Sequence, residues 1–264
     1  MPTSRSIWAR LLFDELAQHQ QPSDAVSLMR QAGMEPDPWQ AALLRSPAQR
    51  LLLLACRQSG KSTTVAVLAL HNSLYQPGSL VLLLSPSLRQ SQELFRKVLT
   101  AYRTLAAAVP TEQESALRIE LANGSRIVSL PGTESTIRGY SGVRLLIIDE
   151  AARVQDDLYY SVRPMLAVSG GRLVALSTPF GKRGWFHQEY TEGHGWERVR
   201  ITASDCPRIS PAFLEEERRS LPVLWFNSEY LCEFSDTEDS VFAYEHVMGA
   251  VTPEVQPLFP GAPL

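Results

Sequence analysis

Four short apolar runs recur along the chain and alternate with segments of helical periodicity. Each run is four or five residues long and consists of Leu, Ile, Val and Ala, which is typical of strands buried on both faces of a parallel sheet. Between the runs, apolar residues recur every three or four positions, as on one face of a helix. The predicted strands are 51–55, 80–84, 145–148 and 173–176, with a fifth at 197–201, and the predicted helices are 62–75, 88–108 and part of 151–168.

The remaining segments predict smaller elements around this alternating pattern. Asn123-Gly124 between two apolar-alternating stretches predicts a β-hairpin over 117–121 and 126–130. We further expect two short helices within 5–33 separated at Pro22, two helices within 211–234, a loop with exposed His187 and His194 over 181–195, and a linker or disordered tail from Pro253. Strands that alternate with helices indicate an α/β fold with a mostly parallel sheet and helices on both faces.

Composition narrows the class of protein without identifying it. The chain has 264 residues, 44% of them hydrophobic, which suits one large domain or one domain with a small appendage. The net charge of −3 gives no global signal for nucleic acid, so any DNA contact must be a local patch. Three cysteines without a C-x-x-C pair indicate buried free thiols. No signal peptide is visible, and no apolar run approaches the roughly 18 residues of a membrane span, so we expect no membrane partner.

The first chemical constellation begins where the first predicted strand ends. Residues 55–62 read Ala-Cys-Arg-Gln-Ser-Gly-Lys-Ser, which matches a phosphate-binding P-loop except that Ala55 replaces the first glycine. The loop follows a strand and opens a helix, so its backbone N–H groups favour an anion. Lys61 would reach the β- and γ-phosphates of ATP, and Ser62 would ligate Mg2+. The predicted nucleotide-binding residues are Gln40, Arg57, Gln58, Ser59, Gly60, Lys61, Ser62 and Thr63.

The second constellation is the acidic pair Asp149-Glu150, directly after the strand 145–148. Carboxyl ends of parallel strands gather at one edge of a sheet, so the pair is expected beside the P-loop. Asp149 would hold Mg2+, directly or through water. Glu150 would act as the general base that polarises the attacking water. The competing interpretation is an acidic strand end that caps the following helix.

Gln40 and the pair Ser177-Thr178 each have both a functional and an ordinary interpretation. The amide of Gln40 could read both the acceptor and the donor on an adenine edge, or Gln40 could be a surface residue beside a buried Trp39. Ser177 and Thr178, at the end of the strand 173–176, could contact the γ-phosphate region and couple its loss to movement. The alternative for Ser177-Thr178-Pro179 is an ordinary turn.

Two arginines are candidates for stabilising the transferred phosphoryl group. Arg57 lies inside the P-loop, and Arg138 lies in a glycine-rich stretch before strand 145–148. An arginine supplied to the γ-phosphate speeds hydrolysis by about 10³- to 10⁵-fold. We predict that Arg138 acts in trans, on a neighbouring subunit, and that Arg57 senses the phosphate within its own loop. A structural ion pair is the alternative for each.

Several of these motifs, in this order, resemble the ATPase domain of tailed-bacteriophage large terminase subunits. The resemblance covers about residues 35–242, and Cys206-Pro207 stands where the family often has Asn-Pro. The motifs that carry it are Arg57-Gln58-Ser59-Gly60-Lys61-Ser62, then Ile137-Arg138-Gly139-Tyr140, Asp149-Glu150-Ala151, Ser177-Thr178-Pro179, Gly181, Trp185-Phe186, Phe226, Glu229-Tyr230-Leu231-Cys232-Glu233-Phe234 and Val241-Phe242.

The resemblance implies a P-loop NTPase fold of the ASCE type with a small helical lid. It implies a core over 1–205, a lid over 206–243 and a linker over 244–264, without the family's nuclease domain. The implied activity is hydrolysis of ATP, with Mg2+, to drive double-stranded DNA into a procapsid, and no DNA cleavage by this chain. The implied partners are DNA, the portal and procapsid, the small terminase subunit and further copies in a pentameric ring, in the host cytoplasm.

Two other functions remain open from the sequence. A helicase-like translocase would share the P-loop, Gln40 and the acidic pair, but not the lid signature. A nucleotide-switched assembly clamp would not need Glu150 as a base. ATP turnover, and its stimulation by procapsid rather than by an unwinding substrate, would separate these functions.

Overall fold

The computed structural model describes residues 24–105, 108–132, 139–235 and 248–249. The predicted first helix within 5–22, the tail from Pro253 and Arg138 therefore lie outside the described residues. The strands are β1 Arg50–Ala55, β2 Leu80–Ser85, β3 Thr111–Glu114, β4 Arg118–Leu121, β5 Arg126–Pro131, β6 Leu145–Asp149, β7 Arg172–Ser177 and β8 Glu197–Ile201.

These strands form one sheet with the order β3-β4-β5-β2-β6-β7-β1-β8. The six strands from β5 to β8 in this order pair in parallel, whereas β3 and β4 continue the sheet in antiparallel pairing. The four apolar runs and the predicted fifth strand are all strands of this sheet, and the predicted hairpin is β4–β5. The edge strand β3 was not predicted, because its sequence Thr-Glu-Gln-Glu is mostly exposed and carries no apolar alternation.

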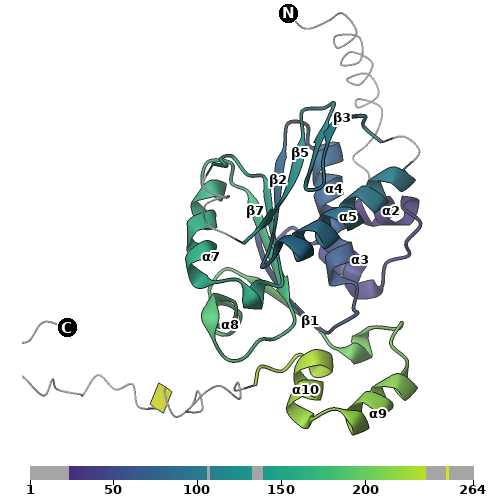
Figure 1. Cartoon of the computed structure of the whole chain (residues 1–264), viewed down its shortest axis with the longest axis vertical. Helices are drawn as coiled ribbons and strands as arrows, with labels where there is room; N and C mark the ends of the chain where they lie inside the picture. The colour runs from purple at the N-terminus through teal and green to yellow at the C-terminus, as the bar shows by residue number, and fades with distance from the viewer. Residues whose placement is uncertain (1–23, 106–107, 133–138, 236–247, 250–264) are drawn as a thin grey trace, which may run out of the picture.

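Helices cover both faces of the sheet (Figure 1). On one face, α4 and α5 pack against the strands, and α2 and α3 lie against α4. On the other face lie α7 and α8, while α9 and α10 form a pair near the carboxyl end of β1. The helices are α2 Ala25–Gln31, α3 Pro38–Arg45, α4 Lys61–Tyr75, α5 Leu88–Thr104, α7 Asp156–Val162, α8 Gly184–Thr191, α9 Pro211–Ser220 and α10 Val223–Leu231, with 3₁₀ helices η1 Ala151–Arg153, η2 Arg163–Leu166 and η3 Ala203–Asp205.

The core lies between the central strands and these helices. Leu51 to Leu54 of β1 and Leu82 to Leu84 of β2 are fully buried, because helices cover both faces of the sheet. Burial of a leucine side chain contributes about 1.5–3 kcal/mol, so the strands hold the sheet in place mainly through their apolar side chains.

None of the described helices combines the length and the apolar character needed to cross a membrane. The three cysteines are buried and free, as predicted.

The structure corrects the prediction of a loop over 181–195. The segment contains α8, in which Trp185, Phe186 and His187 are buried. Trp185 stacks on Tyr159 with ring centroids 3.8 Å apart, and its indole N–H donates to the carbonyl of Val154. This burial stabilises a short helix that the glycine-rich composition does not favour. His187 is therefore not exposed, and the prediction for that residue was wrong.

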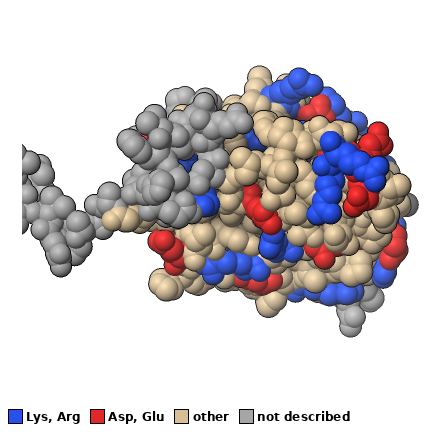
Figure 2. Space-filling model, turned by 90° about the horizontal axis from the view of Figure 1, so that it is seen from below, with Lys and Arg blue, Asp and Glu red and all other residues tan. Residues whose placement is uncertain are grey.

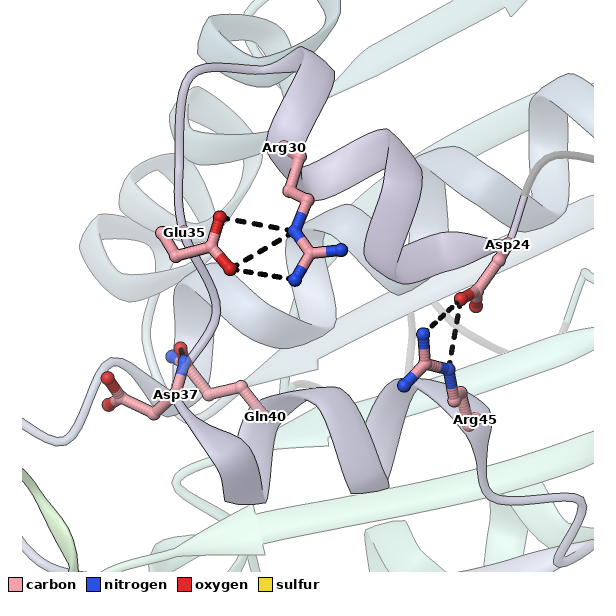
Figure 3. Close-up of polar contacts among 6 residues, drawn as sticks. All are labelled: Asp24, Arg30, Glu35, Asp37, Gln40 and Arg45. Atoms are coloured by element: carbon pink, nitrogen blue, oxygen red, sulfur yellow. Dashed lines mark hydrogen bonds and ion pairs between the residues drawn. The ribbon is translucent and has the colours of Figure 1, made fainter.

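Helix α3 was not predicted, although its sequence carries a start signal. Asp37 is the N-cap, Pro38 follows at the first helical position, and the Gln40 side chain accepts from the backbone N–H of Asp37. Figure 3 shows Gln40 turned back towards Asp37, and the exposed ion pairs Arg30–Glu35 and Asp24–Arg45 around α2 and α3. Exposed pairs of this kind contribute little. Burial of the apolar faces of α2 and α3 is the larger contribution.

Candidate nucleotide site

The candidate site forms where three neighbouring strands end. Strand β7 lies between β1 and β6, with Leu54 paired to Ser177 and Leu176 paired to Asp149. The segments that follow are the P-loop after β1, Thr178 after β7 and Glu150 after β6. Parallel pairing thus brings together the three motifs that the sequence analysis singled out, although they are far apart along the chain.

The P-loop has the backbone of a tight anion-binding turn. Gln58 and Gly60 both have positive φ angles, of 60° and 89°, and α4 begins directly after Gly60. A side chain at Gly60 would be strained by this backbone and would also meet Gln40 Nε2 at 2.9 Å, so glycine is required there. Ala55, which replaces the usual first glycine, is the fully buried last residue of β1. That position needs no left-handed backbone, which explains why alanine is accommodated.

Lys61 and Glu150 form an ion pair across the site. Lys61 Nζ lies 3.1 Å from Glu150 Oε1, and their side chains are only 10% and 21% exposed. Glu150 itself has a left-handed backbone, with φ of 51°, and is the N-cap residue of η1. Such a conformation is uncommon for a residue other than glycine and is often found at functional sites. The turn places the carboxylate over the start of α4.

Asp149 lies at the buried end of β6, beside Ser62. Burial raises the pKa of its carboxyl above the ordinary value, whereas the positive charge of Lys61 and a hydrogen bond from the Ser62 side chain oppose that rise. The backbone N–H of Glu150 also donates to Asp149 Oδ1, at 3.0 Å. A carboxylate and a hydroxyl in contact are a suitable ligand pair for Mg2+, which takes few protein ligands and completes its shell with water and phosphate oxygens. Among the described residues, no group of three His, Cys, Asp or Glu forms a site for a metal held by protein alone.

The Gln40 amide is buried and has a protein partner at each end. Its oxygen accepts from Asp37 N at 2.8 Å, and its Nε2 donates to Thr64 Oγ1 at 3.0 Å. The Thr64 hydroxyl in turn donates to the carbonyl of Gly60. Gln40 thus links α3 to the start of α4, next to the P-loop. It is not the surface residue of the alternative interpretation, and its adenine-reading role stays a prediction.

Arg57 at the tip of the P-loop contacts α10. Its Nε lies 3.0 Å from Glu229 Oε2, and its backbone N–H donates to the carbonyl of Glu229 at 3.1 Å. The Arg57 side chain is 65% exposed, whereas that of Glu229 is 12% exposed. The ion pair of the alternative interpretation is therefore present, and it ties the loop to the helical pair α9–α10.

Arg208 and Arg153 also reach the site, and neither was predicted. Arg208 Nη2 lies 2.8 Å from Asp37 Oδ2 and donates to the P-loop carbonyl of Ser59 at 2.7 Å. Arg153 Nη1 lies 3.1 Å from Glu150 Oε2 and 3.2 Å from Thr178 Oγ1. The spacing of Arg153 three residues after Glu150 was a usable signal. No local pattern distinguishes Arg208.

Ser177 and Thr178 are buried at the end of β7. Thr178 accepts from Arg153, and Ser177 Oγ is a buried hydroxyl for which the described residues provide no hydrogen-bond partner. An unpaired buried hydroxyl at a site edge suits a position that meets a ligand or ordered water.

On the face shown in Figure 2, basic and acidic side chains of the described residues are intermixed, and no DNA-binding strip stands out there.

Comparisons with known proteins identify the family of the chain. The model of a family described as "Terminase large subunit, T4likevirus-type, N-terminal" matches residues 52–247. The terminase large subunit of Thermus phage G20c is 29% identical over 248 residues, which cover 80% of this chain and 51% of that protein. The chain thus spans about half the length of the curated relatives it matches.

Solved structures share the same fold. The large terminase ATPase domain of Thermus phage P74-26 superposes with a TM-score of 0.71 at 24% identity, over 82% of this chain and 100% of that one. The large terminase of another thermophilic bacteriophage, solved in complex with ATP-gamma-S, gives a TM-score of 0.59 at 15% identity, over 75% and 52% of the two chains. The mostly parallel sheet with helices on both faces is therefore the P-loop NTPase fold of these proteins.

Proposed function

The chain belongs to the terminase large subunit family, whose ATPase domain it contains, and on that premise we propose that it hydrolyses ATP to drive double-stranded DNA into a procapsid. The observation that carries the proposal is the meeting of Lys61, Glu150, Asp149 and Ser62 at the ends of β1 and β6. A large terminase of the same fold, from a thermophilic bacteriophage, was solved with ATP-gamma-S and with ADP, which supports an adenine nucleotide as the ligand here.

In the proposed reaction, the triphosphate lies over the P-loop and the N-terminus of α4. Lys61 leaves Glu150 and binds the β- and γ-phosphates, which carry more negative charge than a single carboxylate. Glu150 then has a free oxygen with which to accept the proton of the attacking water. Asp149 and Ser62 would hold Mg2+, and the bound ion would supply positive charge against the phosphates. The Lys61–Glu150 pair thus keeps the base occupied until nucleotide arrives.

Phosphate release by the purified chain with Mg2+ and ATP tests the chemistry. We expect Lys61→Ala to abolish hydrolysis, and the exposed Lys97→Ala on α5 to leave it unchanged. Glu150→Gln should keep nucleotide binding and lower kcat by about 10²- to 10⁴-fold, because it removes only the base. Its matched control is Glu93→Gln, an exposed carboxylate on α5. Unchanged turnover in Glu150→Gln would show that Glu150 is not the base.

The partners are tested by what stimulates this activity. We propose that double-stranded DNA, the portal of the procapsid and the small terminase subunit are partners, that copies of the chain form a pentameric ring, and that assembly takes place in the host cytoplasm. Stimulation of hydrolysis by cognate procapsids supports the packaging motor. Stimulation by forked duplexes alone, with strand separation, indicates the helicase-like translocase. Nucleotide binding without turnover indicates the assembly clamp.

A further inference from the structure

Arg153 links two motifs that the proposed reaction treats separately. One nitrogen of its guanidinium, Nη1, lies 3.1 Å from Glu150 Oε2 at the end of β6 and 3.2 Å from Thr178 Oγ1 at the end of β7. The side chain is 29% exposed, and its guanidinium lies over the ring of Phe180, 4.7 Å from the ring centroid. The arginine is therefore held by contacts on two neighbouring strand ends rather than projecting freely into solvent.

The backbone that carries Arg153 is also well supported. Arg153 ends η1, and its N–H donates to the carbonyl of Glu150. The carbonyl of the next residue, Val154, accepts from the buried indole of Trp185 at 3.1 Å. The backbone N–H of Trp185 donates to Asp156 at 2.8 Å, which joins α8 to the start of α7. Movement of the backbone at Arg153 would disturb these contacts, so the point from which its side chain extends is fixed by the fold.

The two oxygens of Glu150 have different partners. Lys61 lies at Oε1, and Arg153 lies at Oε2. If Lys61 moves to the phosphates, Oε1 becomes free while Oε2 keeps its hydrogen bond to Arg153. A carboxylate held at one oxygen presents the other in a defined direction, which is the condition for efficient proton transfer.

We propose that Arg153 is a positioning residue: it holds Glu150 Oε2 so that Oε1 faces the attacking water, and it joins that arrangement to Thr178. This inference rests on the proposed ATPase function and deepens it. Arg153 does not touch substrate in this arrangement and acts through Glu150. Arg153 Nη1 contacts both Thr178 and Glu150, so a shift of Thr178 at the end of β7 would also move Glu150. This contact would connect Thr178, the candidate coupling residue, to the hydrolysis of ATP.

The first test separates positioning from binding and from folding. We expect Arg153→Gln to lower kcat by about 10²-fold while the Kd for ATP-gamma-S and the thermal midpoint stay near wild type. Arg153→Lys retains one donor and should give an intermediate kcat. The matched control is Arg183→Gln, because Arg183 also lies over the Phe180 ring, at 4.9 Å. It should hydrolyse ATP at the wild-type rate.

The second test asks whether Thr178 acts through Arg153. Thr178→Val removes the oxygen that accepts from Arg153 and preserves the shape of the side chain. We expect it to lower kcat in the wild-type background but to have little further effect in Arg153→Gln, because the link is already broken. Multiplicative losses in the double variant would overturn the link.

The outcomes distinguish this inference from the proposed function. A wild-type chain that hydrolyses ATP, with Arg153→Gln equally active, would overturn the positioning role and leave the ATPase intact. Loss of nucleotide affinity and of thermal stability together in Arg153→Gln would show a structural role instead. A wild-type chain that binds ATP without turnover would overturn both.

Discussion

At the scale of single residues, Gln40 shows how one buried amide serves both structure and site. Its oxygen caps α3 through Asp37, and its nitrogen reaches Thr64 on α4. A buried polar group with partners at both ends is costly to remove, at about 1–3 kcal/mol for each partner left unpaired. The same amide lies 2.9 Å from the space where a side chain at Gly60 would be, so it also shapes the P-loop.

Gln40→Ala should therefore lower the thermal midpoint as well as the preference for ATP over other nucleoside triphosphates. The loss of stability follows from the two partners that are left unpaired. The loss of nucleotide preference follows because the site no longer rejects the wrong base through its hydrogen bonds. Thermal unfolding and competition between ATP and GTP measure the two effects. Thr64→Val is the control, because it unpairs the Gln40 nitrogen and keeps the amide. An unchanged nucleotide preference in Gln40→Ala would leave Gln40 with the structural role alone.

A second prediction at the scale of single residues concerns His187 and the stability of the fold at acid pH. His187 is buried in α8, with its ring 4.8 Å from that of Phe234. Burial lowers its pKa below the ordinary value of 6.5, and Lys182 lowers it further, while Glu192 opposes them. As the pH falls below 6.5, the unfolded chain takes up the proton more readily than the folded chain. Acid therefore destabilises the fold through this residue.

The thermal midpoint of the wild-type chain should fall between about pH 7 and about pH 5, and His187→Gln should reduce that fall. Glutamine keeps a polar side chain of similar length but does not titrate in this range. His194→Gln is the control, because His194 is exposed and lies beyond the C-terminal end of α8. If the wild-type chain and His187→Gln lose stability equally, other groups dominate the acid response.

At the scale of elements, the contact between the P-loop and α10 means that Glu229 and the phosphate of ATP would compete for the Arg57 side chain. The guanidinium pairs with Glu229 on α10, yet Arg57 is also the proposed sensor of the phosphate. The Arg57 side of this pair is exposed and the Glu229 side is buried, and the solvent around the guanidinium keeps the contribution near the range for surface pairs, about 0.2–1 kcal/mol. Binding of ATP would need Arg57 to leave Glu229 and would loosen the link between the loop and the α9–α10 pair. One side chain that serves both partners in turn would connect nucleotide binding to movement of this helical pair.

Glu229→Gln should therefore bind ATP more tightly than wild type, by up to about five-fold. Binding becomes tighter because no ion pair with Glu229 has to be broken when Arg57 moves to the phosphate. The Kd for ATP-gamma-S measures it, and Glu215→Gln, which changes an exposed carboxylate on α9, is the control. Weaker binding in Glu229→Gln would mean that the pair holds Arg57 in its productive position instead.

At the scale of the whole molecule, the main prediction concerns Arg138 and a ring. The residue lies outside the described residues, and its role as a trans-acting finger stays a prediction. A ring built by head-to-tail contacts repeats one interface, so a loop of one subunit meets the site of the next. A guanidinium supplied there would stabilise charge on the transferred phosphoryl group only in the assembled ring.

A mixing experiment under ring-forming conditions tests the trans role of Arg138. Arg138→Ala keeps the P-loop and lacks the finger, whereas Lys61→Ala keeps the finger and lacks the lysine. Each variant alone should be nearly inactive, and a mixture should regain part of the ATPase activity, because some sites then combine both parts. Activity of Arg138→Ala alone, or an inactive mixture in normally assembled rings, would contradict the assignment.

The sequence by itself determined the parts of this protein that depend on local pattern. The apolar runs predicted β1, β2, β6 and β7, because a strand covered on both faces must be apolar throughout. The P-loop and the pair Asp149-Glu150 were recognisable because their chemistry needs particular residues in order next to a strand end. These features require no knowledge of what packs against them.

Only the tertiary structure decided which distant residues meet. Helix α8 forms in a glycine-rich segment because Trp185 is buried against Tyr159, and β3 forms because β4 offers an edge for pairing. The partners Arg208 and Glu229 come from segments about 150–170 residues after the P-loop, so no local spacing indicates them. Such contacts depend on strand order and helix packing, which bring side chains together in space without leaving a periodic pattern in the sequence.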